Sequence, residues 1–153
     1  MSVDDHANEI IPRLWLGDKF ASMDGRFLKE KGINAVFNAT KNLPFFDLPV
    51  RKYRMPVDDN LQKAEILNMY LWAPEVVYNI VKEYKSGSNI LIHCAAGRQR
   101  SAALVAMTIG ALYHMGAGKA MEFVRKHRPV AFFPTANFEL AIQKFLTELL
   151  ARV

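Results

Sequence analysis

Hydrophobic and polar positions along the chain alternate between short strand-like runs and longer helix-like runs. The β-rich run Ile10–Leu16 ends at Gly17 and predicts a first strand. Two further short runs, Asn34–Thr40 and Lys52–Val57, predict strands as well. Asn89–His93 is almost wholly apolar, which is typical of a central parallel strand buried on both faces. These runs predict the strands of one sheet.

Longer runs with apolar residues every three or four positions predict the helices. Asp18–Lys31 and Gln62–Lys85 both have this spacing, and Pro74 predicts either a kink or a new helix start within the second. Ser101–Met115 is the most apolar helical run. Two more helices are expected at about Lys119–Lys126 and Asn137–Arg152. Strands that alternate with helices, followed by a helical C-terminal half, predict an α/β fold with a central, mostly parallel sheet flanked by helices.

Length and composition are those of one globular domain, which we expect to span residues 1–153. The 153 residues are 51% hydrophobic and 23% charged, which suits a chain that buries its own core and excludes a disordered one. No apolar run approaches the roughly 18 residues of a membrane span. The polar, acidic segment Met1–Asn8 does not resemble a signal peptide. We therefore expect a cytoplasmic protein.

Charge and cysteine content narrow the function classes. A net charge of +5 favours anionic partners such as phosphorylated protein, phospholipid headgroups or nucleic acid. A basic surface that is simply solvated and binds no partner is the alternative explanation. Cys94 is the only cysteine, which excludes an intramolecular disulfide and a cysteine-rich zinc site. His6, His114 and His127 are scattered along the chain. We expect no metal and no cofactor.

The segment His93–Ser101 lies between the apolar strand and the most apolar helix. Backbone N–H groups of such a loop, together with the positive end of the helix, form an anion site of phosphate size. Gly97 permits the tight turn, and Arg100 offers a planar fork to two phosphate oxygens. Helix N-termini and nearby cations favour a thiolate, so we expect Cys94 to be the nucleophile for phosphoryl transfer.

Other side chains near this segment suggest supporting roles. Ser101 can donate a hydrogen bond to the sulfur of Cys94, and His93 is expected to organise the loop rather than transfer protons. The leaving oxygen of a phosphate ester needs a proton from a carboxylic acid. Asp58 and Asp59, at the end of the third predicted strand, are the two candidates for that acid.

The motif H-C-x-x-G-x-x-R-S of residues 93–101 identifies the chain as similar to the cysteine-dependent protein phosphatases. The short chain and the MPVDD strand end resemble the dual-specificity branch, including the small poxvirus-type enzymes. The similarity runs from IIPRLWLG through RPVAFFPTANF to the last helix. The resemblance implies a metal-independent enzyme that removes phosphate from phosphotyrosine and phosphoserine/phosphothreonine in proteins through a phosphocysteine intermediate.

The resemblance also assigns residues. It favours Asp59 over Asp58 as the acid, because the family acid lies three residues after the position of Pro56. The catalytic set would be Cys94, Arg100, Asp59 and Ser101. The substrate-binding loop would comprise Ala95, Ala96, Gly97, Arg98, Gln99 and Arg100.

One departure leaves the substrate class open. Arg98 is basic where many protein-directed members carry a hydrophobic or small residue, and this resembles the phosphoinositide- and phospholipid-directed branches. Those branches often carry a second basic residue directly after the cysteine, where this chain has Ala95. A solvated rim charge would explain Arg98 equally well. A phosphoinositide phosphatase is therefore the alternative, and a catalytically inactive phospho-binding protein is less favoured because Cys94, Asp59 and Arg100 are all present.

The basic cluster Arg125–Arg128 follows the predicted helix Lys119–Lys126. Cations are favourable at a helix C-terminus, and no aromatic residues interleave with the cluster as a single-strand nucleic-acid binder would require. We interpret the cluster as helix capping and expect no nucleic-acid partner.

Overall fold

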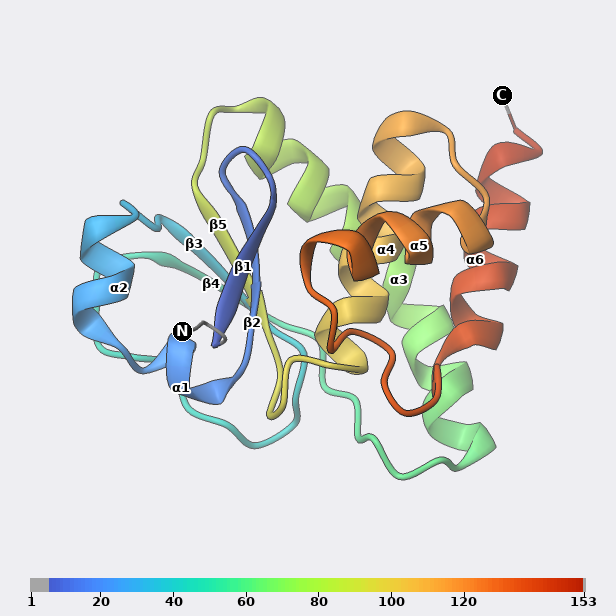
Figure 1. Cartoon of the computed structure of the whole chain (residues 1–153), viewed down its shortest axis with the longest axis horizontal. Coiled ribbons are helices and arrows are strands. Elements are labelled where there is room, and N and C mark those ends of the chain that lie inside the picture. Colours follow the sequence, from blue (N-terminus) through green and yellow to red (C-terminus); the bar gives the residue numbers. More distant parts are fainter. Residues whose placement is uncertain (1–5, 153) are drawn as a thin grey trace.

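The structure is a computed structural model that describes residues 6–152; residues 1–5 and 153, which include most of the segment Met1–Asn8, lie outside the described residues. Within residues 6–152, five strands form one sheet in the order β1-β2-β5-β3-β4 (Figure 1). The β1–β2 pair is antiparallel and the other pairs are parallel. The strands are β1 (Ala7–Ile11), β2 (Leu14–Gly17), β3 (Ala35–Asn38), β4 (Arg51–Arg54) and β5 (Ile90–His93).

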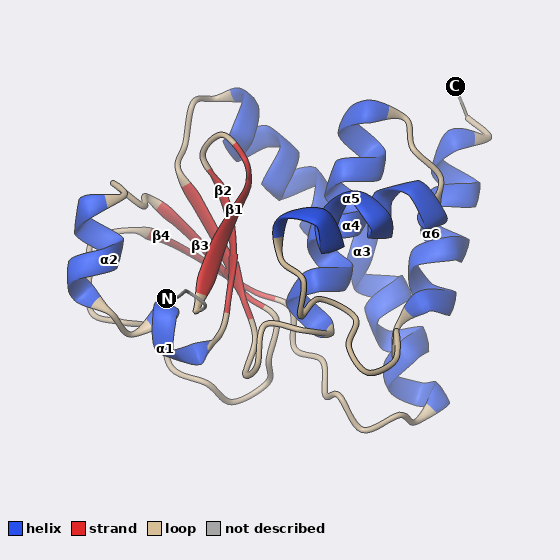
Figure 2. Ribbon diagram, in the orientation of Figure 1, coloured by secondary structure: helices blue, strands red, loops and turns tan. Residues whose placement is uncertain are grey.

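Helices cover both faces of this sheet, as Figure 2 shows. Two short helices, α1 (Lys19–Ser22) and α2 (Gly25–Glu30), lie on one side. Four longer helices lie on the other side: α3 (Lys63–Lys85), α4 (Arg100–Tyr113), α5 (Ala117–His127) and α6 (Glu139–Leu150). The mostly parallel sheet flanked by helices confirms the predicted fold class.

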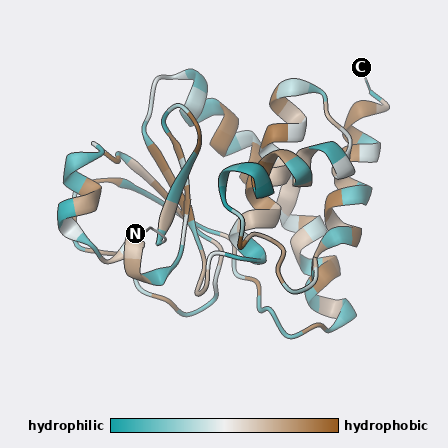
Figure 3. Ribbon diagram, in the orientation of Figure 1, coloured by the Kyte–Doolittle hydropathy of each residue, from teal (hydrophilic) through white to brown (hydrophobic). Residues whose placement is uncertain are grey.

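Alternate residues of the central strands enter two separate cores. Ile90 and Ile92 of β5 join Phe37 of β3 in the larger core beneath α3–α6. Leu91, between Ile90 and Ile92, and Val36, directly before Phe37, join the smaller core beneath α2. This alternation follows from the two-residue period of a strand. Figure 3 shows the hydrophobic colouring gathered on these strands and on parts of the helices.

The first predicted strand, Ile10–Leu16, is wrong as a single strand because the chain reverses within it. Pro12 has no N–H to donate to a sheet ladder, and Arg13 has a φ of 75°. The guanidinium of Arg13 donates to the backbone oxygens of Tyr84 (3.1 Å) and Ser88 (2.8 Å). The result is the β1–β2 hairpin, whose β1 strand is the antiparallel edge of the sheet.

The predicted helix Asp18–Lys31 is divided into α1 and α2 because two aspartates each start a helix. The Asp18 carboxylate accepts hydrogen bonds from the N–H groups of Phe20 and Ala21, at 2.9 and 3.0 Å. The Asp24 carboxylate accepts one from the Phe27 N–H at 3.1 Å. Such local bonds satisfy the first N–H groups of a new helix.

The remaining elements agree with the predictions within a few residues. Strand β4 is Arg51–Arg54 and stops before Pro56, which cannot donate to a ladder. Helix α3 continues through Pro74, so this proline starts no separate helix. No single helix among residues 6–152 is long and apolar enough to cross a membrane; α4 and α5 reach that length only as a pair, with a bend of 116° between them.

Candidate active site

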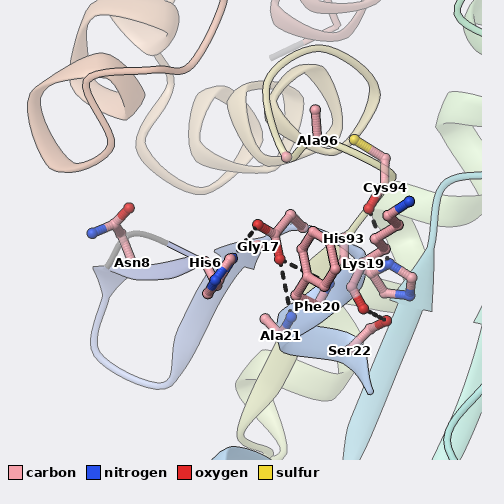
Figure 4. A network of polar contacts seen from close by, with 12 residues as sticks. His6, Asn8, Gly17, Lys19, Phe20, Ala21, Ser22, His93, Cys94 and Ala96 are labelled. Carbon is pink, nitrogen blue, oxygen red and sulfur yellow. Dashed lines mark hydrogen bonds and ion pairs between the residues drawn. The ribbon is translucent and has the colours of Figure 1, made fainter. Parts of the chain in front are cut away.

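The segment from the end of β5 to the first residue of α4, residues 94–100, is named the Cys94 loop below. Its backbone carbonyl groups are bonded to donors outside the loop. The Lys19 N–H donates to Ala95 O at 3.0 Å, and the Phe132 N–H donates to Arg98 O at 2.7 Å. The Cys94 N–H contacts Gly17 O at 3.4 Å, and Figure 4 shows Gly17, Lys19 and Cys94 close together where the loop begins. The contacts of Gly17 and Lys19 hold the loop against the end of β2, and the contact of Phe132 holds it against the segment between α5 and α6.

Arg128 supports the loop from behind, although its side chain is only 2% exposed. Its Nε donates to Gly97 O at 2.8 Å, and its Nη2 lies 3.4 Å from Ala96 O. Its Nη1 donates to the side-chain oxygen of Asn8 at 2.8 Å. Gly97 has a φ of 66°, and a Cβ there would lie 2.7 Å from Gly17 O. A larger residue at this position would therefore displace both the turn and its support.

The bonding of the carbonyl groups decides where the loop amides point. The N–H groups of residues 95–99 have no hydrogen-bond partner among residues 6–152. They stand beside the N-terminus of α4, whose own first N–H groups are free of intrahelical partners. A group of unpaired N–H donors at a helix N-terminus attracts an anion such as phosphate.

Cys94 lies at the base of the loop and is 2% exposed. Its Sγ is 3.1 Å from the Oγ of Ser101, which is fully buried in the first turn of α4. The same Oγ lies 3.5 Å from Gly17 O. A serine hydroxyl carries one hydrogen, which the Ser101 hydroxyl can donate to the cysteine sulfur.

His93 is fully buried at the end of β5. Burial lowers the pKa of His93 from 6.5 to about 4, so the imidazole is neutral near pH 7. Its Nδ1 lies 3.4 Å from Cys94 O, and its Nε2 has no partner among residues 6–152. A neutral, buried imidazole suits loop support better than proton transfer.

Arg100 connects the Cys94 loop with the segment that bears the two candidate acids. Its Nη1 donates to Val57 O at 2.9 Å, one residue before Asp58. Its Nε is buried and has no hydrogen-bond partner among residues 6–152. The guanidinium therefore retains donor capacity that a phosphate could use.

The two neighbouring aspartates have different surroundings. The Asp58 carboxylate lies 3.1 Å from Lys41 Nζ, and the Asp58 N–H donates to Glu65 Oε1 at 3.0 Å. Hydrogen bonds to Glu65 and Asp58 raise the pKa of Lys41 above 10.5. The Asp59 carboxylate instead is exposed and accepts a hydrogen bond from Asn137 Nδ2 at 3.0 Å. The Asp58 side chain is thus engaged by a cation, whereas that of Asp59 lies toward the segment before α6.

The other loop residues face in different directions. The Gln99 side chain, in a residue only 7% exposed, turns into the segment before α6, where its Nε2 donates to Thr135 O at 2.5 Å. Only the backbone of Gln99 can therefore face a ligand. Arg98 and Ala96 are exposed, and Ala95 is half-buried. Arg98 thus lies at the solvent-facing side of the loop.

Two contributors to this site were missed in the sequence. Arg125, Lys126 and His127 occupy the last turn of α5, as the capping interpretation expects, but the Arg128 side chain enters the interior instead. No local pattern separates Arg128 from its basic neighbours. Asn137 was also missed, because only the fold brings it to Asp59 from 78 positions away.

Among residues 6–152, no group of three or more His, Cys, Asp or Glu side chains is placed to hold a metal ion.

Comparison with known proteins points to one family. A family model described as "Dual specificity phosphatase, catalytic domain" matches residues 14–147. Human dual specificity protein phosphatase 2 is 31% identical over 143 residues, a match that covers 93% of this chain and 44% of the relative. The chain spans less than half the length of the curated relatives that it matches.

Solved structures agree with the fold. The crystal structure of human DUSP28 is similar with a TM-score of 0.84 and 24% identity, covering 96% of this chain and 97% of that one. The crystal structure of a human tyrosine phosphatase-like serine/threonine/tyrosine-interacting protein has a TM-score of 0.81 and 26% identity, with coverage of 94% and 97%.

Proposed function

The chain belongs to the family of dual specificity phosphatase catalytic domains, and on this premise we propose that it removes phosphate from phosphotyrosine and phosphoserine/phosphothreonine in proteins. Residues 1–153 would act as one catalytic domain, and we expect this to take place in the cytoplasm. No metal or cofactor enters the proposed reaction.

The proposed reaction has two steps. In the first, the Cys94 thiolate attacks phosphorus, the P–O bond to the leaving group breaks, and Asp59 gives its proton to the departing oxygen. In the second, the Asp59 carboxylate takes a proton from water, whose oxygen attacks phosphorus. The P–S bond breaks, inorganic phosphate leaves and the Cys94 thiolate is restored. Ser101 would stabilise the sulfur as it departs.

The observation that carries this proposal is the orientation of the Cys94 loop. Its carbonyl groups are held outward by Lys19, Arg128 and Phe132, which leaves the N–H groups of residues 95–99 unpaired around Cys94. Donors fixed before the substrate arrives stabilise the charge on a transferring phosphoryl group without reorganisation. Arg100 would supply two further donors to the equatorial oxygens.

The exposed position of Arg98 favours phosphoinositides as a second candidate substrate class. A cation at the solvent-facing side of the loop attracts a second anionic group, which every phosphoinositide carries and a singly phosphorylated peptide need not carry. Ala95 supplies no second cation. We therefore propose phosphoproteins as the main substrates and phosphoinositides as the alternative.

The test compares wild type with Cys94→Ser on an aryl phosphate, on phosphopeptides and on phosphoinositides. We expect turnover by wild type, best on phosphopeptides, and none by Cys94→Ser. Phosphate should still inhibit or bind the variant with similar affinity, because the cradle is built mostly of backbone. Near-normal turnover by Cys94→Ser would contradict a phosphocysteine intermediate. If wild type prefers phosphoinositides to phosphopeptides, the chain is a phosphoinositide phosphatase rather than a protein phosphatase.

A further inference from the structure

Asp59 lies on an exposed turn where little holds its side chain. The residue is exposed, as are the next two residues of the chain, Asn60 and Leu61. A carboxyl group on such a turn samples several positions, and only those near the leaving oxygen allow proton transfer. The fraction of time that Asp59 spends in the productive position would therefore limit the rate.

Asn137 supplies a directed contact to this carboxyl group. Its Nδ2 donates to Asp59 Oδ1 at 3.0 Å. The Thr135 hydroxyl lies 2.6 Å from Asn137 Oδ1 and can donate to it. An ionised carboxylate only accepts hydrogen bonds, so the contact with Asp59 requires the NH₂ group of Asn137 to face Asp59, and the hydroxyl of Thr135 can then donate to the amide oxygen on the other side. The asparagine is thus oriented as a donor toward the acid.

Gln99 joins this asparagine to the Cys94 loop. Its Oε1 accepts from the Asn137 backbone N–H at 2.9 Å, while its Nε2 contacts Thr135 O and Phe133 O at 2.5 and 3.4 Å. The residue is 7% exposed, so these bonds are shielded from competing water. One buried side chain therefore sets the distance between the Cys94 loop and the segment that carries Asn137.

We infer that Asn137 and Gln99 are positioning residues for the proposed acid: Asn137 holds the Asp59 carboxyl group, and Gln99 holds Asn137 at a set distance from the nucleophile. This inference rests on the proposed function. Neither side chain would touch the reacting atoms. Asn137 acts through Asp59, and Gln99 acts through Asn137. The Asn137–Asp59 contact is a single exposed hydrogen bond, and its loss should lower the population of the productive position roughly three- to tenfold, which corresponds to about 0.7–1.4 kcal/mol.

The first experiment measures kcat and KM of Asn137→Ala on two aryl phosphates, one with a poor leaving group and one with a good leaving group. We expect kcat to fall roughly three- to tenfold for the poor leaving group, which needs the proton, and less than about twofold for the good one. KM and inhibition by phosphate should stay unchanged, because the anion cradle is intact. Gln143→Ala, an exposed residue on α6, is the matched control and should equal wild type.

Two further variants separate positioning from a general loss of structure. Asn137→Asp keeps the shape of the side chain but removes the hydrogen-bond donor. Its kcat on the poor leaving group should fall at least as far as that of Asn137→Ala. Gln99→Ala should show the same dependence on the leaving group as Asn137→Ala, because its backbone in the Cys94 loop is retained. Thermal unfolding identifies any variant whose loss comes from misfolding.

The decisive measurement combines Asn137→Ala with Asp59→Asn. If Asn137 acts through Asp59, the second substitution adds nothing once the acid is gone, so the two losses are not additive. Additive losses, or an equal loss on both aryl phosphates, would overturn the inference while leaving the proposed function standing. Wild type without phosphatase activity would overturn both. We expect Asn137→Ala to lower kcat on the poor leaving group in wild type and to have no effect on kcat in the Asp59→Asn variant. That result would support the inference and the proposed function.

Discussion

The Cys94 loop and the segment that bears the proposed acid, residues 57–61 (the acid segment), lie at the same site but are held in different ways. The loop is bonded through its carbonyl groups to Lys19, Phe132 and the buried Arg128. The acid segment is mostly exposed. Its backbone is bonded to Arg100 and Glu65, and the two aspartate side chains are held by the Lys41–Asp58 ion pair and the Asn137–Asp59 hydrogen bond. Buried bonds such as those of Arg128 resist competition by water, whereas an exposed ion pair contributes about 0–1 kcal/mol and an exposed hydrogen bond roughly 1 kcal/mol.

The difference matches the two chemical tasks that we propose. A transferred phosphoryl group has the same shape in every substrate, so its cradle benefits from donors fixed in advance. The leaving oxygen comes from different side chains, and the acid must also serve as a base toward water in the second step. A carboxyl group held by a few weak contacts can adjust to both partners. Each prediction below perturbs one side of this comparison.

The largest effect is expected at the acid segment itself. Asp59→Asn should lower kcat on a poor leaving group by roughly 10²–10⁴-fold, because the variant has no proton to give. An aryl phosphate with a good leaving group should be affected much less. Asp58→Asn is the matched control, and its loss should show no dependence on the leaving group. The opposite pattern in the two variants would move the acid to Asp58.

The next effect concerns the support behind the Cys94 loop. Arg128→Met should lower the free energy of unfolding by about 3–4 kcal/mol, since it leaves buried carbonyl groups of the loop without donors. Inhibition by phosphate should weaken as well. Lys126→Met, an exposed basic residue of the same helix end, should change stability by less than about 0.5 kcal/mol. Urea unfolding of wild type and both variants measures these free energies. Equal stabilities would show that the loop does not depend on Arg128.

A pH-dependent effect is expected from His93. Burial lowers its pKa to about 4 in the folded protein, whereas the ordinary value of 6.5 holds in the unfolded chain. Between these values the unfolded chain binds a proton that the folded protein does not, so stability is present above pH 6.5 and is lost as the pH falls toward 4. The free energy of unfolding should therefore fall by about 2–3 kcal/mol more for wild type than for His93→Gln between pH 7 and 4. Parallel stability curves for the two proteins would contradict this expectation.

The smallest effect is expected at the solvent-facing side of the loop. Arg98→Ala should raise KM for a doubly phosphorylated peptide about three- to tenfold and leave a simple aryl phosphate almost unchanged. Salt should reduce the difference, because an exposed contact is screened. Arg26→Ala removes an equal charge from α2, where the side chain is 86% exposed, and controls for net charge. A loss of equal size on the aryl phosphate would place Arg98 in the cradle itself.

The placement of the Cys94 loop between a buried strand and an apolar helix could be predicted because it is local in the sequence. An apolar strand, a glycine-containing turn and an apolar helix together determine that Cys94, Arg100 and Ser101 meet at one helix N-terminus. The period of apolar residues likewise predicted the sheet and most helices. The errors arose where a single residue overrides a periodic pattern, as Pro12 and Arg13 do in the β1–β2 hairpin and Asp24 does at the start of α2.

The tertiary structure alone decided how the Cys94 loop is supported and how the proposed acid is held. Arg128 and Asn137 come from segments distant in the chain, and nothing near them in the sequence distinguishes them from neighbouring polar residues. Asp58 and Asp59 are equivalent to a local pattern, and they differ only because Lys41 lies beside one and Asn137 beside the other. A local sequence determines which groups can react, because backbone geometry over a few residues sets their spacing. Which groups hold them is decided by packing, because those contacts form only when distant segments are folded together.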